Sequence, residues 1–304
     1  FGLAFKTDNS PETDTIQKLV GQASFAKSTI KDNMLIQHAI YNSRLLKTVN
    51  KERYIESNME IALNTNQFFV MYQPKIELLT DKIVGAEALV RWNSPNLGVV
   101  YPDEFIPLFE KNGFVVECDH FVWKRTCENL KRWQNKGIRT VPISINASKL
   151  TIEKPDLITR IQEPVKDNQI SPKQLHLEVT ETLMENNIDE LVTKLNSLRL
   201  IGYQIELDDF GAGYSSINTL STLPIDVVKL DMSFMKEFGD AKRSKVLAAS
   251  INLAKELGYK TVSEGVEYEE QCEVLGILGV DIIQGYLYSK PLPEEEFEQY
   301  LMKY

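Results

Sequence analysis

The sequence predicts an α/β protein: a TIM-like (β/α)8 barrel with a short N-terminal α/β appendage and a connecting helix. From about residue 68 onward, short apolar or β-branched runs alternate with amphipathic stretches of helical period. From Glu87 onward, most runs follow one another at intervals of about 20–35 residues, the length of a strand plus a crossover helix. Roughly eight such runs favour a closed barrel over an open sheet.

The residues before the barrel show a different pattern and are too few for an independent hydrophobic core. We interpret residues 1–55 as the tail of an upstream domain plus a linker helix, and residues 56–304 as the barrel domain. Because the chain begins with Phe1, we expect it to be part of a longer polypeptide. The expected elements are a strand at 2–5, a helix at 14–30, a strand at 34–41 and a long helix at 43–66.

The barrel strands are predicted from their apolar runs, and amphipathic helices are expected between them. The runs that indicate these strands are FFVMYQP (68–74), KIVGAEAL (82–89), VPISIN (141–146), LHLEV (175–179), YQIELDD (203–209), DVVKLD (226–231), YKTVSEG (259–265) and VDIIQGY (280–286). The clearest predicted helices are 121–136, 187–202, 241–258 and 267–279.

The composition excludes several classes of function. A net charge of −9 argues against a basic surface for nucleic acid, so we expect no DNA partner. No run approaches the roughly 20 apolar residues of a membrane span, and the N-terminus lacks a signal pattern. We expect a cytoplasmic location without membrane contact, either free or as the cytoplasmic part of a longer, membrane-anchored protein. The three cysteines are widely spaced and predict free thiols.

A polar or charged residue closes each apolar run. Single charged residues often flank strands as solvated ends, but active sites of such barrels are built at the C-terminal strand ends. Carboxylate and amide oxygens suit Mg²⁺ or Mn²⁺ rather than zinc. The residues at the run ends are Glu87, Asn146, Glu178, Asp208, Asp209, Lys229, Glu264 and Gln284.

Several carboxylates close together repel one another, and divalent cations would relieve this repulsion. They would also let an acidic protein hold an anionic phosphodiester. Asp209, expected just beyond its strand, could bridge to or serve a second ion, as in two-metal hydrolases. Gly211 and Gly213 predict a loop that approaches the site. Lys229 lies in an apolar run, where a structural salt bridge and a role in activating water are both open.

These motifs resemble those of the EAL-domain phosphodiesterases, which hydrolyse the bacterial second messenger cyclic di-GMP. The resemblance covers about residues 65–293. The matching segments are QP (73–74), EALVRW (87–92), INAS (145–148), LEVTET (177–182), DDFGAGYSS (208–216), PIDVVKLD (224–231), SEGVE (263–267) and QGYLYSKP (284–291).

The resemblance implies two Mg²⁺ or Mn²⁺ ions and hydrolysis of cyclic di-GMP to linear pGpG. One metal would be held by Glu87, Asn146, Glu178 and Asp208, and the other by Asp208, Asp209 and Glu264. Lys229 would position or activate water, and Glu181 would anchor the loop that begins at Asp209. Residues implied to contact substrate are Gln73, Leu89, Arg91, Asn146, Glu267, Gln284 and Pro291.

The resemblance also implies a homodimer and an upstream sensory or GGDEF-like domain. QASFAKSTIKDN (22–33) is loosely similar to the tail of a GGDEF domain, but the chain contains no GGDEF motif and cyclase activity is not expected. The alternative to hydrolysis is a receptor that binds cyclic di-GMP without cleaving it. A carboxylate-pair glycosidase would not explain Asn146, Lys229 and the Asp208–Asp209 pair.

Overall fold

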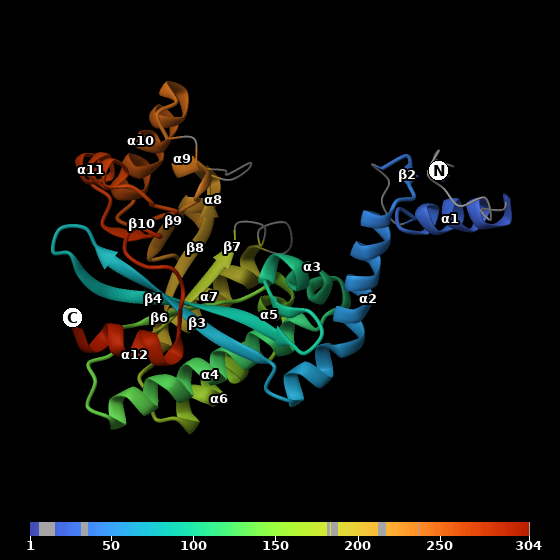
Figure 1. Cartoon of the computed structure of the whole chain (residues 1–304). Helices are drawn as coiled ribbons and strands as arrows, with labels where there is room; N and C mark the ends of the chain where they lie inside the picture. The colour runs from blue at the N-terminus through green and yellow to red at the C-terminus, as the bar shows by residue number, and fades with distance from the viewer. Residues whose placement is uncertain are drawn as a thin grey trace.

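The computed structural model describes residues 1–5, 16–31, 36–180, 183, 188–211, 217–236 and 238–303, with backbone alone at 217–219. Within these residues, eight strands close into a barrel, because β3 pairs with both β4 and β11 (Figure 1). The predicted TIM-like barrel is therefore confirmed. The barrel strands are β3 (Phe68–Glu77), β4 (Lys82–Ser94), β6 (Ile143–Asn146), β7 (Leu175–Thr180), β8 (Gln204–Phe210), β9 (Val227–Leu230), β10 (Lys260–Glu264) and β11 (Ile282–Gln284).

Strand β3 departs from the regular alternation of strands and helices. It runs antiparallel to both neighbours, whereas the other barrel strands pair in parallel. Only residues 78–81 separate β3 from β4, which is too short for a crossover helix. Because of this reversed direction, residues early in β3 lie near the C-terminal ends of the parallel strands. Gln73 accordingly pairs with Glu87, and Lys75 pairs with Gly85.

Helices surround the barrel, and the main core lies between them and the strands (Figure 1). Trp92, Trp123 and Trp133 are fully buried there. The helices predicted at 121–136, 187–202, 241–258 and 267–279 overlap α4, α7, α10 and α11. The larger helices are α3 (Pro102–Asn112), α4 (Val115–Asn135), α6 (Leu157–Asp167), α7 (Ile188–Ile201), α10 (Ala241–Glu256), α11 (Glu269–Leu278) and α12 (Glu294–Lys303). The shorter elements are β5 (Gly98–Val100), α5 (Lys149–Glu153), a 3-10 turn (Pro172–Gln174), α8 (Ile217–Thr222), α9 (Ser233–Lys236) and β12 (Leu292–Pro293).

The N-terminal appendage lies at the far end of helix α2 (Ser43–Asn64), away from the barrel (Figure 1). It contains helix α1 (Ile16–Ser28) and the short parallel strands β1 (Gly2–Leu3) and β2 (Ala39–Ile40). Asn42 caps α2 by accepting a hydrogen bond from the Leu45 backbone.

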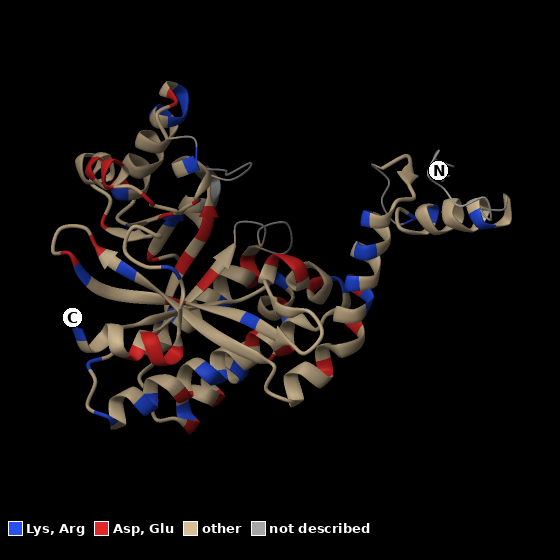
Figure 2. Ribbon diagram, in the orientation of Figure 1, with Lys and Arg blue, Asp and Glu red and all other residues tan. Residues whose placement is uncertain are grey.

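The second half of α2 packs on the barrel domain. Ile55 is buried, and the ring of Tyr54 stacks on Trp92 with centroids 6.5 Å apart. Lys and Arg positions follow one another along α2 in Figure 2, and one of them, Lys51, forms an ion pair with Glu104 of α3. Among the described helices, none combines the length and apolarity needed to cross a bilayer.

Candidate active site

Four carboxylates from four different strands surround the ammonium of Lys229. This side chain projects from β9 into the barrel and is 1% exposed. Successive side chains of a strand point to opposite faces. Val228 and Leu230 point outward into the core between strands and helices, so the Lys229 side chain points into the barrel. The ammonium nitrogen lies 2.8 Å from Glu178, 2.9 Å from Asp208, 2.8 Å from Glu264 and 3.5 Å from Glu87.

Amide side chains extend this cluster on the side of Glu87. Asn146 donates from its side chain to Glu87 over 3.2 Å, and the indole of Trp123 in α4 fixes the Asn146 backbone carbonyl at 2.9 Å. Gln284 donates to the other Glu87 oxygen over 2.5 Å and to the Gln73 side chain over 3.2 Å. The structure therefore brings together the predicted residues of β3, β4, β6 and β11.

The two neighbouring aspartates, Asp208 and Asp209, reach the same site through a local distortion of β8. We expected Asp209 beyond the strand, but the strand continues through Phe210, and its register shifts between Leu207 and Phe210. Asp209 also has a left-handed φ of 57°. Such a bulge breaks the alternation of side chains. Oxygens of Asp208, Asp209 and Glu264 consequently lie within 4.8 Å of one another.

Gly211 follows this bulge at a position where the backbone conformation and the space around it both require glycine. Its φ is 97°, and a Cβ there would lie 2.4 Å from the ring of Phe234. The backbone can therefore turn away from the strand only with glycine at this position. Gly213 and the proposed loop anchor Glu181 lie outside the described residues.

Burial and neighbouring charges shift the pKa values of the carboxylates in the cluster. Burial raises the pKa of Glu178 well above its usual range and that of Glu264 to about 8. Burial and the neighbouring Asp208 raise the pKa of Asp209 to about 6. The pKa of Glu87 is lowered despite its burial, because nearby lysine ammonium groups outweigh desolvation. Lys229 is the ammonium at the centre of the cluster. With a pKa of about 8, the carboxyl of Glu264 holds a proton at neutral pH.

The donor set fits hard divalent cations. The available ligand atoms are carboxylate oxygens and the Asn146 amide oxygen, the type of ligand that Mg²⁺ and Mn²⁺ prefer. Asp208, Asp209 and Glu264 are close enough to share one ion. Glu87 and Glu178 contact Lys229, which also contacts Asp208 and Glu264.

Arg91 lies near the cluster in a buried position. It is 9% exposed, donates to the Val90 carbonyl over 2.7 Å and lies 5.5 Å from the centre of the Tyr101 ring. Its buried Nε has no hydrogen-bond partner among the described residues. Since buried donors are normally satisfied, this N–H is available to donate a hydrogen bond to a bound anion.

The other residues implied to contact substrate lie around the mouth of the barrel. Glu267 is exposed after β10, and its backbone NH is held by Gln271 at 2.8 Å. Pro291 is half-buried and immediately precedes β12, which pairs with β3. Leu89 is half-buried in β4, two residues after Glu87, and lines the cavity described next.

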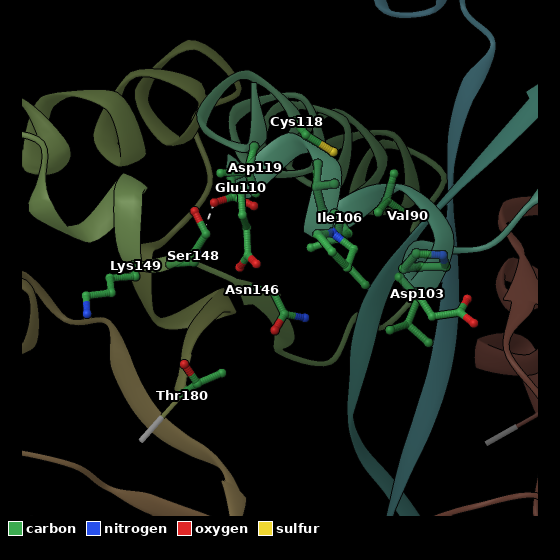
Figure 3. Close-up of a pocket in the computed structure, with 17 residues that line it drawn as sticks. Val90, Asp103, Ile106, Glu110, Cys118, Asp119, Asn146, Ser148, Lys149 and Thr180 are labelled. Atoms are coloured by element: carbon green, nitrogen blue, oxygen red, sulfur yellow. Dashed lines mark hydrogen bonds between the residues drawn. The ribbon is translucent and has the colours of Figure 1, made fainter. Parts of the chain in front are cut away.

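A cavity of about 380 Å³ adjoins the cluster between β4, α3 and α4. Apolar walls come from residues such as Leu89 and Ile106, and the side chains of Glu110 and Asn146 point into the space (Figure 3). Buried Asp119 accepts hydrogen bonds from the Ser148 backbone at 2.9 Å and the Thr151 hydroxyl at 2.6 Å. Burial raises the pKa of Asp119 to about 6.

Sequence reasoning missed this cavity and also missed Lys75 and Glu206, which lie inside the barrel. Lys75 interrupts the apolar run FFVMYQPKIE in the way that Lys229 interrupts VVKL. The argument applied to Lys229 would have predicted a buried ion pair there too. Glu206 lies two residues before Asp208 on β8, a spacing that places both on one face of a strand.

The chain belongs to the EAL domain family, whose model matches residues 56–291. It is 34% identical over 265 residues to the cyclic di-GMP phosphodiesterase NbdA of Pseudomonas aeruginosa, covering 87% of this chain and 34% of NbdA. It is 31% identical over 283 residues to the bifunctional diguanylate cyclase/cyclic di-GMP phosphodiesterase MucR of the same organism, covering 93% of this chain and 41% of MucR. The chain therefore spans less than half the length of these relatives.

A solved structure of the MucR phosphodiesterase in complex with cyclic di-GMP has a similar fold. The TM-score is 0.76 at 33% sequence identity, and the alignment covers 80% of this chain and 99% of the other. The similarity therefore extends over the whole of that phosphodiesterase chain.

Proposed function

We propose that this protein hydrolyses cyclic di-GMP to linear pGpG with two divalent cations, Mg²⁺ or Mn²⁺. The observation that carries the proposal is the convergence of Glu87, Glu178, Asp208 and Glu264 from four strands onto one point. Membership of the EAL family supports the reaction, and relatives named as cyclic di-GMP phosphodiesterases support the substrate.

The formal charge of the carboxylate and lysine network supports the presence of two ions. Six carboxylates and two lysines form the connected network, which leaves a formal excess of four negative charges. Two divalent cations carry the same number of positive charges. The carboxylates are Glu87, Glu178, Glu206, Asp208, Asp209 and Glu264, and the lysines are Lys75 and Lys229.

We propose that Glu87, Asn146, Glu178 and Asp208 hold one ion, and that Asp208, Asp209 and Glu264 hold the other. When bound, such ions lower the pKa of water and neutralise charge on a phosphodiester. Lys229 would hold the carboxylates in place and orient the attacking water through its ammonium. Glu181 would anchor the loop after Asp209.

The remaining residues would bind the substrate. Arg91 would donate its free Nε to a phosphate oxygen, and Gln73 and Gln284 would orient the sugar-phosphate ring from β3 and β11. Glu267 would accept from a guanine edge, and Leu89 and Pro291 would supply apolar contacts.

The cavity beside Asn146 would receive one base of the dinucleotide. Guanine presents N–H donors at one edge, and the carboxylates of Glu110 and Asp119 at this cavity are suitable acceptors. Its apolar walls suit the faces of a purine ring. The cavity thus matches guanine in polarity.

A receptor that binds without cleaving is the second candidate. Every position implied to hold metal carries an oxygen ligand in this chain, which favours hydrolysis. The test is chromatographic analysis of products from cyclic di-GMP with Mg²⁺ or Mn²⁺, with and without a chelator. Conversion to pGpG that stops with chelator supports hydrolysis, whereas tight binding without turnover would assign the protein to the receptor class.

We also propose that residues 1–55 are the tail of an upstream sensory or GGDEF-like domain with a linker helix, and that residues 56–304 form the phosphodiesterase domain. A homodimer and a cytoplasmic location belong to the same proposal, because the family resemblance implies the former and an intracellular messenger the latter. Light scattering of the purified protein tests the dimer by its mass.

A further inference from the structure

We propose that Lys75 is a positioning residue that holds Glu178 in the orientation needed to bind a divalent cation. This inference rests on the metal site proposed above. Lys75 lies on β3 inside the barrel, and its side chain is 4% exposed. Its ammonium nitrogen is 2.6 Å from the Ser144 hydroxyl, 2.8 Å from Glu178 and 2.6 Å from Glu206. An ammonium has three N–H donors, so each one is used.

The partners of Lys75 connect it to three strands that carry proposed metal ligands. Ser144 lies two residues before Asn146 on β6, and Glu206 lies two residues before Asp208 on β8. Residues two apart on a strand face the same side. Lys75 therefore sits one step below the proposed ligands and contacts β6, β7 and β8 together.

Glu178 is held between two ammonium groups. One of its carboxylate oxygens contacts Lys75 and the other contacts Lys229, each at 2.8 Å. Two charged contacts on opposite oxygens restrict rotation of the carboxylate plane. Lys229 also serves three other carboxylates, whereas Lys75 approaches Glu178 from beneath. Lys75 thus supplies the second contact that fixes the orientation of the Glu178 carboxylate.

Glu206 balances the charge of Lys75. Its second oxygen accepts a hydrogen bond from His176 Nδ1 at 2.6 Å, and the residue is 2% exposed. Lys75 and Glu206 together are formally neutral, which leaves the charge of Glu178 for a cation. The stem of Lys75 lies beside its cross-strand partner Gly85.

The competing interpretation is that this ion pair only stabilises the barrel. Removing one partner would leave a buried unpaired charge and destabilise the fold, but replacing both partners can be neutral. The double variant Lys75→Met/Glu206→Gln removes one positive and one negative charge. Since the net charge of the site hardly changes, a loss of metal affinity in a folded variant reports the orientation of Glu178.

The experiment measures Mn²⁺ binding to the whole protein by electron paramagnetic resonance of the free ion, without nucleotide. For the double variant we expect a dissociation constant about 10–100-fold higher than for the wild type, the usual cost of losing a residue that orients a metal ligand. The matched control is Arg199→Met/Asp226→Asn. It removes an ion pair of 2.7 Å at the opposite end of the barrel and should leave Mn²⁺ affinity unchanged.

A folded double variant whose dissociation constant stays within about twofold of wild type overturns the proposal and leaves the pair a structural role. Should the double variant fail to fold, Glu206→Gln alone provides the test, because Lys75 then keeps Glu178 and Ser144 as partners and its charge is not left unpaired. Lys75 would then be neutralised only by Glu178, so Mn²⁺ affinity should fall by about tenfold or more. Unchanged affinity in that variant also overturns the proposal.

The wild type separates this proposal from the proposed function. Mn²⁺ binding without turnover of cyclic di-GMP would refute hydrolysis but leave the role of Lys75 supported by a loss of affinity in the double variant. A wild type that binds no Mn²⁺ would overturn both the metal site and the role of Lys75.

Discussion

The ammonium of Lys229 lies 2.8 Å from the carboxylate of Glu264, although 34 residues lie between them in the chain, and the two belong to the adjacent strands β9 and β10. The contact shows that a lysine is the positive charge at the centre of the acidic cluster. One ammonium carries a single positive charge, which is fewer than the negative charges of the four carboxylates around it. Burial and the neighbouring carboxylates of Asp208 and Glu87 raise the pKa of Glu264 to about 8.

Divalent cations should therefore stabilise the folded protein. At a concentration one hundred times the dissociation constant, Mg²⁺ or Mn²⁺ should raise the free energy of unfolding by about 2.7 kcal/mol, and a chelator should remove this gain. Urea denaturation with and without metal measures the effect. The control is Asp209→Asn/Glu264→Gln, which keeps the size of the side chains, removes ligands of one ion and leaves those of the other, and should therefore show a smaller gain; an equal gain in this variant would contradict the assignment of these ligands.

Glu87→Gln should abolish turnover while the barrel stays folded. Glutamine keeps the size of the side chain and can still accept from Gln284, but it loses the charge that faces the cation. We expect kcat to fall by more than the roughly 10–100-fold typical of residues that only orient a ligand. Steady-state hydrolysis of cyclic di-GMP measures the loss, and circular dichroism checks the fold. Activity close to that of the wild type would remove Glu87 from the metal site.

The stability of the protein should depend on pH through Asp119. Burial raises its pKa from an ordinary value of 3.8 to about 6, so the folded state favours the protonated form. The stabilisation from this proton is complete below about pH 4 and is lost as the pH rises through 6. A shift of about two pKa units corresponds to about 3 kcal/mol.

Asp119→Asn should therefore gain up to about 3 kcal/mol relative to the wild type between pH 4 and pH 7.5. Asparagine stays neutral and its oxygen can still accept from Thr151. Urea denaturation of both proteins at the two pH values isolates this group, because the other titrating groups cancel in the difference. A difference that does not change with pH would show that Asp119 titrates normally.

Gly211→Ala should destabilise the protein more than Gly98→Ala. Both glycines have a positive φ, which costs another residue about 1–2 kcal/mol. Only at Gly211 would the new Cβ also collide with a ring, that of Phe234, while the space around Gly98 is open among the described residues. Thermal unfolding compares the two variants. Equal losses would mean that the Phe234 ring moves aside without cost.

Much of the barrel and its site could be predicted because the information is local. A β-branched run such as VVKL identifies a strand by itself, and a carboxylate at the end of a parallel strand must face the same rim as its neighbours. For this reason Asn146, Glu178 and Asp208 could be assigned to one site before the strands were placed. Glu87 was expected at the end of its run, but it lies inside β4, which continues to Ser94. The long helix α2 followed from a continuous helical pattern without Gly or Pro.

Other features depended on contacts between distant segments. The bulge that turns Asp209 toward Asp208 arises from the pairing of β8 with β9, and no residue type marks it. The partners of Lys75 lie 69, 103 and 131 residues away in the chain. The cavity beside Asn146 forms only when α3 and α4 pack beside β4.

The sequence by itself determined which segments form strands and helices, and which polar groups lie at the strand ends, because hydrophobic period and strand direction are set within short stretches of chain. Only the tertiary structure decided the antiparallel direction of β3, the bulge at Asp209 and the ion pairs beneath the proposed metal ligands. These depend on strand register and on side chains that meet across the barrel, and register is a property of paired segments rather than of either one alone.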